Sequence, residues 1–415
     1  MRILLTGATG FIGSHLARTL TLAGHSVLCA VRAPPQPARY EYVTLDIARM
    51  TNAAAWLPYL RDIDAVINAV GIFEQRGAAT FAILHTEMPR ALFAACATAR
   101  VKRIVQISAL GAALDADTEF LRSKARADEA LLQQKTALVL QPSLVFGAGG
   151  ASSELFVKLA ALPALVLPDG GTQRIQPVHI DDICTAVLRY VEAAPIFAYG
   201  RIAAVGPRAL RMRDYLQTLR AALGHSAPLI ISVSSGLLAG LARWLPLPWL
   251  QPDALRMLQR GSCADAAAFA ALMQRTPRAP ETFAADVVAI EGEWRVRLGI
   301  NALRLSLAPL WIVTGIISLW VYPIASSLEL LARSGVPAPL QLPALYGAAL
   351  LDIAFGIAIV FMHSRRRWLW RAQAMLIVFY SAVIAWKLPE FWLHPYAPMV
   401  KNIPLLAAIY LLSKR

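Results

Sequence analysis

Three glycines near the start of the chain stand at a spacing that suits the binding of a diphosphate. They lie in Thr6-Gly7-Ala8-Thr9-Gly10-Phe11-Ile12-Gly13, which follows a short apolar run and precedes a helical stretch. The free amides of a helix N-terminus attract phosphate, and the glycines permit the turn, the close backbone approach and the tight helix packing that this requires. In this strand–turn–helix context the motif predicts a dinucleotide site; a glycine turn without ligand is the alternative.

The residue after the second expected strand bears on the choice of dinucleotide. Arg32 stands there, directly after residues 26–31, and no carboxylate is present at this position. A carboxylate would hold the ribose 2′-hydroxyl of NAD, whereas the guanidinium fork of an arginine matches a 2′-phosphate. The sequence therefore favours NADP(H) over NAD(H), with a merely solvated Arg32 as the alternative.

The elements that must hold this loop alternate between strands and helices. Apolar strands are expected at 1–6, 26–31, 43–45, 65–68, 103–108 and 137–141, with amphipathic helices between them. Such strands require a parallel sheet that is covered on both faces. We therefore predict an α/β fold, a doubly wound parallel Rossmann sheet over residues 1–225. Substrate-subdomain insertions are expected from about residue 142, and residues 226–300 form a further subdomain or linker region.

Short motifs continue the pattern beyond the glycine loop. They are Asp46-Ile47, Asn68-Ala69-Val70-Gly71, Ile107-Ser108-Ala109-Leu110-Gly111, Ser123-Lys124-Ala125, Gln141-Pro142-Ser143-Leu144-Val145-Phe146-Gly147 and Val178-His179-Ile180-Asp181-Asp182. As a set over about residues 1–225, they resemble the extended, atypical branch of the short-chain dehydrogenases/reductases. More narrowly, they resemble the group related to the respiratory complex I accessory subunit of that fold.

This resemblance implies roles for individual residues. Asp46 and Ile47 would flank the adenine, Val70 and Gly71 would lie along the cofactor, and Lys124 would bind the nicotinamide ribose. The expected cofactor-binding residues are together Thr6, Gly7, Thr9, Gly10, Phe11, Ile12, Gly13, Arg32, Asp46, Ile47, Ala69, Val70, Gly71, Lys124 and Pro142.

The same resemblance draws attention to a missing tyrosine. In this superfamily a Tyr four residues before the Lys exchanges the substrate proton, and the nearby ammonium lowers the pKa of the phenol. Ser108 and Lys124 are present as candidate catalytic residues, but Phe120 occupies the tyrosine position and has no proton to give. Either the domain binds the cofactor without ordinary carbonyl reduction, or the proton comes from elsewhere, as it could when a quinone or flavin accepts hydride.

A second group of polar residues has a structural explanation. His179, Asp181 and Asp182 could form a catalytic pair, but an aspartate there also suits the cap of a helix, and we favour capping.

The last third of the chain predicts a membrane domain. The hydrophobic share of the whole chain is 57% and the charged share only 16%. Apolar segments lie at about 305–323, 342–362, 372–388 and 398–412. The first three are long enough to cross a bilayer, and the fourth is marginal. We therefore expect residues 301–415 to form an all-α bundle of four transmembrane helices.

Basic residues around these segments predict an orientation. Arg295, Arg297 and Arg304 precede the first segment, residues 365–367 and Arg371 lie around the second loop, and Lys414 and Arg415 end the chain. By the positive-inside rule both termini are cytoplasmic. The apolar stretch at Ile3–Leu5 is not a signal peptide, because it ends at once in the glycine loop. We expect a multi-pass protein of a bacterial-type inner membrane.

The tail also resembles the DoxX-like family of small four-helix membrane domains. The motifs that carry this are Leu310-Trp311-Ile312-Val313-Thr314-Gly315, Tyr346-Gly347-Ala348 with Leu351-Asp352, and Pro395-Tyr396 with Lys401-Asn402-Ile403-Pro404. Asp352 falls within the second segment and should face the bundle interior, where it is either protonated or paired, with Lys387 and Lys401 as candidate partners. It is either an interhelical polar contact or a site for a quinone head group or proton.

Composition limits the remaining alternatives. The net charge of +14 fits membrane flanks better than nucleic acid, since residues from 301 onward supply half of it. Four cysteines without ligand spacing predict reduced thiols and no metal site. Residues 237–250 hold two Trp and two Pro, and are either subdomain core or a surface that touches lipid headgroups.

Two functions remain open. One is an NADP(H)-dependent redox protein acting on a lipophilic acceptor, a quinone or a lipid at the membrane surface. The other is a non-catalytic sensor or assembly module, in which NADP(H) is structural or sensed and the membrane domain docks a protein partner. Phe120 favours the second hypothesis, whereas Ser108 and Lys124 favour the first.

Overall fold

The computed structural model describes residues 1–134, 137–193, 200–241, 252–362, 366–395 and 397–414. Within these residues the chain divides into two compact units, Met1–Gly292 and Glu293–Arg415. Most of the stretch at 237–250, and the arginines at 365 and 415, lie outside the described residues.

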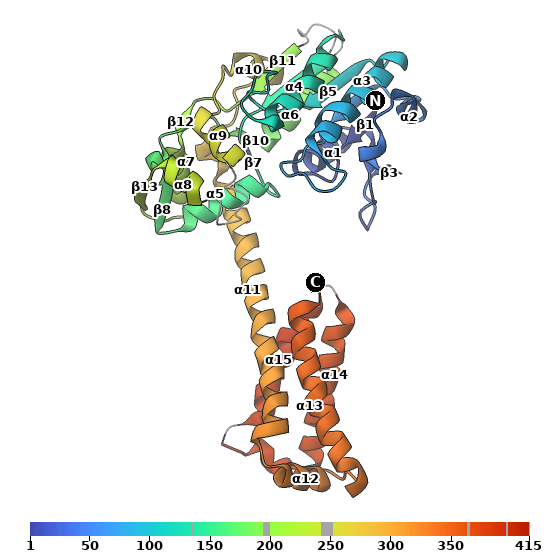
Figure 1. The fold of residues 1–415 in the computed structure, drawn as a ribbon, viewed down its shortest axis with the longest axis vertical. Coiled ribbons are helices and arrows are strands. Elements are labelled where there is room, and N and C mark those ends of the chain that lie inside the picture. Colours follow the sequence, from blue (N-terminus) through green and yellow to red (C-terminus); the bar gives the residue numbers. More distant parts are fainter. Residues whose placement is uncertain (135–136, 194–199, 242–251, 363–365, 396, 415) are drawn as a thin grey trace. The chain divides into compact units, whose positions relative to one another are not determined.

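A seven-stranded sheet forms the centre of the first unit (Figure 1). Every strand is parallel to its neighbours, and the order is β11-β6-β5-β4-β1-β2-β3. The strands are β1 (Arg2–Thr6), β2 (Ser26–Val31), β3 (Glu41–Thr44), β4 (Ala65–Asn68), β5 (Arg103–Ile107), β6 (Ala137–Pro142) and β11 (Gly200–Ala204). The predicted doubly wound Rossmann sheet is confirmed, and β11 is a strand that the sequence pattern did not predict.

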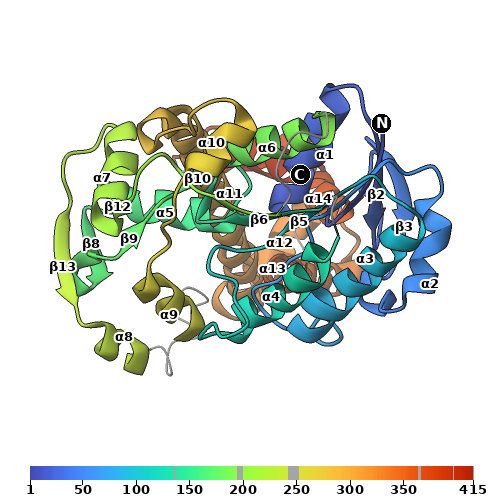
Figure 2. The same cartoon turned by 90° about the horizontal axis from the view of Figure 1, so that it is seen from above.

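Helices cover both faces of this sheet (Figure 2). One face carries α1 (Phe11–Leu22), α6 (Ile180–Glu192) and α10 (Ala267–Met273). The other carries α2 (Ala53–Trp56), α3 (Met88–Thr98), which follows a π-helical turn at Ala82–Glu87, and α4 (Glu119–Leu132). The central strands are apolar on both sides because both faces are covered.

A smaller lobe of the first unit combines short strand pairs with helices. It contains β7 (Val145–Phe146) with β10 (Val178–His179), β8 (Ala164–Pro168) with β13 (Leu229–Val233), and β9 (Arg174–Ile175) with β12 (Leu210–Arg211). Its helices are α5 (Ala151–Ala161), α7 (Met212–Ala222), α8 (Ser235–Leu241) and α9 (Pro252–Arg260).

A separate apolar core holds this lobe together. Leu165, Tyr215 and Leu219 are buried in it, and so is Phe283 just before α11 (Ala284–Ile316). Val287 and Ile290 join the same core, so the first turns of α11 belong to the first unit.

The second unit consists of long apolar helices. Among the described residues, three helical stretches are long and apolar enough to cross a membrane, namely Pro280–Val321, Ala338–Phe361 and Arg367–Lys387. The last two are α13 and α14, and the shorter α15 (Pro398–Ser413) is the fourth expected segment. The stretch between the first two expected segments contains one more helix, α12 (Ile324–Arg333). The predicted α-helical bundle is confirmed.

Two glycines let the first and second spanning helices approach closely. A Cβ on Gly315 would lie 2.5 Å from the carbonyl oxygen of Ala349, and one on Gly356 would lie 2.4 Å from Cγ1 of Ile312. Small residues at such contacts are typical of helices that pack within lipid.

Candidate dinucleotide site

The turn between β1 and α1 has the geometry that a dinucleotide requires. Gly7 adopts φ +75°, and a Cβ there would lie 2.6 Å from the carbonyl of Ala69. A Cβ on Gly13 would lie 2.0 Å from the oxygen of Gly7, so no larger residue fits without a shift. Gly10 caps α1, whose first turn contains no acidic residue. The helix N-terminus is therefore free to receive the negative charge of a diphosphate.

A chain of buried side chains fixes this turn against the neighbouring strands. The hydroxyl of Thr6 donates to Oδ1 of Asn68 at 2.6 Å, and Nδ2 of Asn68 donates to Oε1 of Gln106 at 2.7 Å. The amide of Val70 also donates to Oδ1 of Asn68, at 3.2 Å. The Thr6 side chain, predicted to bind cofactor, is fully buried and thus positions the turn.

The remaining predicted residues occupy the carboxyl edge of the sheet or the start of α1. Arg32 is exposed directly after β2, and Asp46 and Ile47 follow β3. Asp46 lies 3.2 Å from Nε of Arg49. Thr9, Phe11 and Ile12 surround the N-terminus of α1, and Pro142 ends β6 in a buried position. The strand ends of a parallel sheet meet at one edge, where ligands of such folds bind.

Lys124 reaches the same edge from α4. Its ammonium donates to the carbonyl oxygens of Val70 and Ile107, at 3.2 and 3.1 Å. A Cβ on Gly71 would lie 3.3 Å from the same nitrogen, so the structure brings Lys124 together with Val70 and Gly71 as expected. Burial lowers the pKa of Lys124 to about 8, an effect that the nearby Asp128 opposes.

Ser108 does not face an open site. Its hydroxyl donates to Oδ2 of Asp128 at 2.5 Å, and Gln141 donates to the same oxygen at 3.4 Å. Burial raises the pKa of Asp128 to about 6, although the bond from Ser108 lowers it. Asp128 is a buried titratable group that the sequence analysis missed. The sequence did contain a signal for it, because Asp128 stands four residues after Lys124 and therefore on the same helix face.

Phe120 belongs to an aromatic cluster. Phe73 stacks on it with ring centroids 4.9 Å apart, while Phe81 and His85 meet it edge to face. Phe120 is buried, whereas Phe73 is 81% exposed. The tyrosine position is thus filled by one member of an apolar cluster that reaches the surface through Phe73.

His85 is the other residue of this region that sequence reasoning missed. Its Nε2 accepts the amide proton of Ile72 at 3.0 Å, and Nδ1 lies 3.1 Å from the hydroxyl of Ser123. Because Ser123 donates its proton to the carbonyl of Phe120, Nδ1 is the protonated nitrogen of a neutral ring. Burial and the nearby Lys124 lower the pKa of His85 to about 2, which keeps the ring neutral, and its two contacts link Ile72 to α4.

Comparison with protein families assigns both units. Residues 3–202 match the model of the NAD-dependent epimerase/dehydratase family, and residues 308–410 match the model of the DoxX-like family. The chain joins an epimerase/dehydratase-family domain to a DoxX-like membrane domain. The glycine turn packs too closely against neighbouring backbone for a Cβ at Gly7 or Gly13, and the start of α1 that it exposes fits the pyridine nucleotide that this domain family binds.

Curated relatives match part of the chain. The chain is 26% identical over 194 residues to subunit 9 of the NADH dehydrogenase 1 alpha subcomplex of Arabidopsis thaliana, covering 44% of this chain and 48% of that protein. It is 25% identical over 194 residues to a ceramide reductase of Caulobacter vibrioides, covering 45% of this chain and 60% of the reductase. The aligned part is thus less than two thirds of either relative.

Solved structures share the fold of a larger part of the chain. MoeE5 in complex with UDP-glucose and NAD matches with a TM-score of 0.53 at 18% identity, covering 72% of this chain and 99% of that one. The UDP-N-acetylglucosamine 4-epimerase from Bacillus cereus matches with a TM-score of 0.53 at 17% identity, over 70% and 98%. At these identities the likeness shows the fold alone.

The His179 region of the epimerase/dehydratase-family domain is structural. His179 caps α6 by accepting the amide proton of Asp181, so the expected aspartate cap is wrong. Asp182 instead accepts bonds from Arg275 at 2.5 Å and from the amide of Arg278 at 2.8 Å. His179 also lies 3.2 Å from Asp286, so this network fastens the start of α11 to the end of β10.

In the DoxX-like domain, Asp352 is buried as expected. Its Oδ1 has no hydrogen-bond partner among the described residues, and neither Lys387 nor Lys401, both exposed, forms an ion pair with it there. The expected lysine partner is therefore wrong. In the same bundle, Trp311 donates to Gln373 at 2.9 Å.

The lowered pKa of Lys124 predicts a pH dependence of nucleotide binding by the epimerase/dehydratase-family domain. The ammonium is expected to hold the nicotinamide ribose through charge-assisted bonds, and it loses its charge as pH rises through about 8. The affinity for NADPH should therefore fall by about fivefold between pH 7 and 9, measured by calorimetry. A Lys124→Met variant should bind more weakly and show no such step. A parent chain whose affinity stays flat to pH 9 contradicts the role of Lys124.

Proposed function

We propose that the chain is a membrane-bound NADP(H)-dependent oxidoreductase that acts on a lipophilic acceptor, a quinone or a lipid, at the cytoplasmic surface of an inner membrane. One observation carries this proposal. A nucleotide-binding turn and helices that can span a membrane occur in a single chain, which keeps the nucleotide domain near membrane-resident substrates. The names of the relatives, a ceramide reductase and subunits of NADH dehydrogenase, are in keeping with it.

The chemistry follows from what the site keeps and lacks. The bound nicotinamide would supply hydride, and Lys124 would hold its ribose. Phe120 supplies no proton, so a quinone acceptor would take hydride from the nucleotide and a proton from water. The exposed Phe73 offers an apolar surface to such an acceptor.

The decisive measurement is steady-state oxidation of NADPH by the purified full chain with a panel of quinones and lipid ketones. Turnover that depends on the acceptor and disappears in a Lys124→Met variant supports the oxidoreductase. Absence of turnover with every acceptor, with NADPH still bound, favours the second candidate, a sensor or assembly module. The hydrogen bond from Ser108 to Asp128 supports that second candidate, because it engages the hydroxyl of the candidate catalytic serine.

Arg32 provides the test of nucleotide preference. In an Arg32→Glu variant, NADPH should bind about tenfold more weakly, and NADH no more weakly than before, because a carboxylate repels the 2′-phosphate and suits a 2′-hydroxyl. Arg39, which is also exposed in the loop after β2, gives a matched control as Arg39→Glu. The preference for NADP(H) is rejected if the parent and the Arg32→Glu chain bind NADPH with equal affinity. It is also rejected if the parent binds NADH more tightly than NADPH.

Asp352 is proposed to bind the acceptor or its proton. Its Oδ1, which has no partner in the described part of the bundle, could accept a hydrogen bond from a quinol or, when protonated, donate one to a quinone. An Asp352→Asn variant should bind a short-chain quinone about tenfold more weakly in calorimetry while assembling normally. Unchanged quinone affinity with normal assembly assigns Asp352 a purely structural role.

A further inference from the structure

A strand pair in the first unit is apolar on both of its faces. In the pairing of β8 with β13, Leu229 stands opposite Ala164 and Ile231 opposite Val166. The intervening residues Leu165 and Leu167 are buried in the core of the smaller lobe. Because successive side chains of a strand point to opposite faces, Val166, Leu229 and Ile231 share the face that points away from this core. We call these three residues the outer face.

The outer face is open to solvent in the described structure. Val166 is 54% exposed, Leu229 66% and Ile231 43%. Leu162, just before β8, and Leu237, in α8 after β13, are large exposed apolar residues on either side in sequence. Soluble proteins seldom expose neighbouring β-branched and leucine side chains in such a group, and where they do, the surface usually contacts a partner or a membrane.

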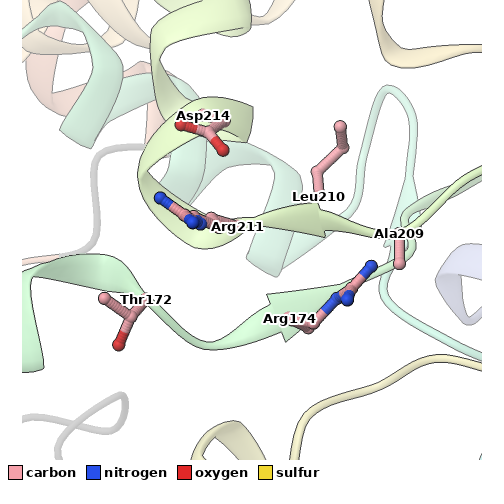
Figure 3. A pocket seen from close by; sticks show the side chains of 6 residues that line it. All are labelled: Thr172, Arg174, Ala209, Leu210, Arg211 and Asp214. Atoms are coloured by element: carbon pink, nitrogen blue, oxygen red, sulfur yellow. The ribbon is translucent and has the colours of Figure 1, made fainter.

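Positive charge lies at one end of the same strand pair. The chain leaves β8 through a turn at Asp169–Gly171, which packs against β13. Thr172 then lines a hollow of about 550 Å³ together with Arg174, Ala209, Leu210, Arg211 and Asp214 (Figure 3). Arg174 and Arg211 are exposed, and within the described part of the chain neither forms an ion pair. Arg213 lies close by, because a Cβ on Gly171 would be 3.1 Å from its Cβ.

The acidic side chains of this region contact other partners than Arg174 and Arg211. Asp214 lies 3.6 Å from Nε of Arg213, and Asp169 accepts the amide proton of Ser235. Arg174 and Arg211 thus remain available for an anion that comes from outside the unit. Guanidinium groups match the oxygens of a phosphate.

We propose that the outer face docks the first unit onto the headgroup region of an anionic bilayer. Its apolar side chains would enter the interface, while Arg174 and Arg211 would meet lipid phosphates. The helices of the DoxX-like domain keep a bilayer within reach of this unit, and guanidinium groups beside an apolar surface are typical of interfacial binding. The proposal does not depend on hydride transfer, so it stands or falls separately from the proposed function.

Quenching by lipid tests the proposal on the full chain in nanodiscs. A Cys263→Ser substitution first removes the exposed native thiol. An Ile231→Cys substitution then supplies a single exposed thiol, to which an environment-sensitive fluorophore is attached. The matched control is Leu22→Cys, at an exposed apolar position at the end of α1. In discs that contain phosphatidylglycerol and spin-labelled lipid, quenching at position 231 should be about twofold greater than at position 22. Melting temperatures of the labelled proteins check that both remain folded.

The lipid composition tests the part assigned to the arginines. Discs of phosphatidylcholine alone, or an Arg174→Ala/Arg211→Ala variant in the anionic discs, should reduce the quenching at position 231 towards that at position 22. Equal quenching at the two positions in anionic discs overturns the docking. Blue-shifted emission that spin-labelled lipid does not quench also overturns the docking to lipid. Seen in discs that hold one copy or two, it indicates that a protein partner or a second copy covers the outer face. Quenching that is the same in both lipids and in the arginine variant refutes recognition of anionic lipid.

Discussion

In a Phe120→Tyr variant, NADPH-dependent reduction of a lipophilic ketone is expected to rise by about 100-fold, because a positioned general acid contributes about 10²–10⁴-fold. Phe120 and Lys124 lie four residues apart on α4, which places them on one helix face. The Lys124 ammonium would lower the pKa of the new phenol, as the chemistry of this superfamily requires. The measurement is the initial rate of NADPH oxidation with the full chain in detergent.

Phe81→Tyr is the matched control for this gain. Phe81 is a buried member of the same aromatic cluster, but it does not precede Lys124 by one helical turn. It should therefore add a hydroxyl without adding turnover. No gain in Phe120→Tyr, in a protein that binds NADPH normally, would show that the loss of the tyrosine is not the only barrier. The engagement of Ser108 by Asp128 would then be the next feature to test.

A Gly13→Ala substitution is expected to abolish most nucleotide binding. The added Cβ would stand 2.0 Å from the oxygen of Gly7, and relief of that clash must move either the turn or α1. Overpacking of this kind costs about 1–3 kcal/mol, which corresponds to about a tenfold to hundredfold loss of affinity when the displaced element is the binding turn. Calorimetry with NADPH measures the loss, and thermal unfolding measures the accompanying destabilisation.

Gly292→Ala serves as the control, since a Cβ there meets no atom within 4 Å and the residue lies within α11. It should leave both affinity and melting temperature nearly unchanged. A Gly13→Ala chain that binds NADPH as tightly as the parent would refute the assignment of this turn to the diphosphate.

Much of the first unit could be predicted because its signals are local. The central strands are continuous apolar runs, and the glycine turn combines spacing with a defined context. β11 was missed because Gly200–Ala204 has a mixed pattern and only partial burial, and its strand character depends on pairing with β6. α12 was missed because its ten residues are too short to span and were assigned to a loop.

The site was predictable in position but not in its contacts. Gly7 and Lys124 were found from motifs, whereas the bond from Ser108 to Asp128 and the stacking of Phe73 on Phe120 join residues far apart in sequence. Such contacts depend on how helices seat on the sheet, which no local period encodes. The lysine partner expected for Asp352 was wrong for the same reason, because sequence cannot tell which faces of two helices meet.

The shared helix α11 has a consequence for the order in which the protein is made. Phe283, Val287 and Ile290 close the core of the smaller lobe, and the first spanning segment follows them in the same helix. During synthesis from the N-terminus, that lobe cannot complete its packing until the segment destined for lipid is next to leave the ribosome. Final folding of the nucleotide domain and delivery of the chain to the membrane therefore coincide in time.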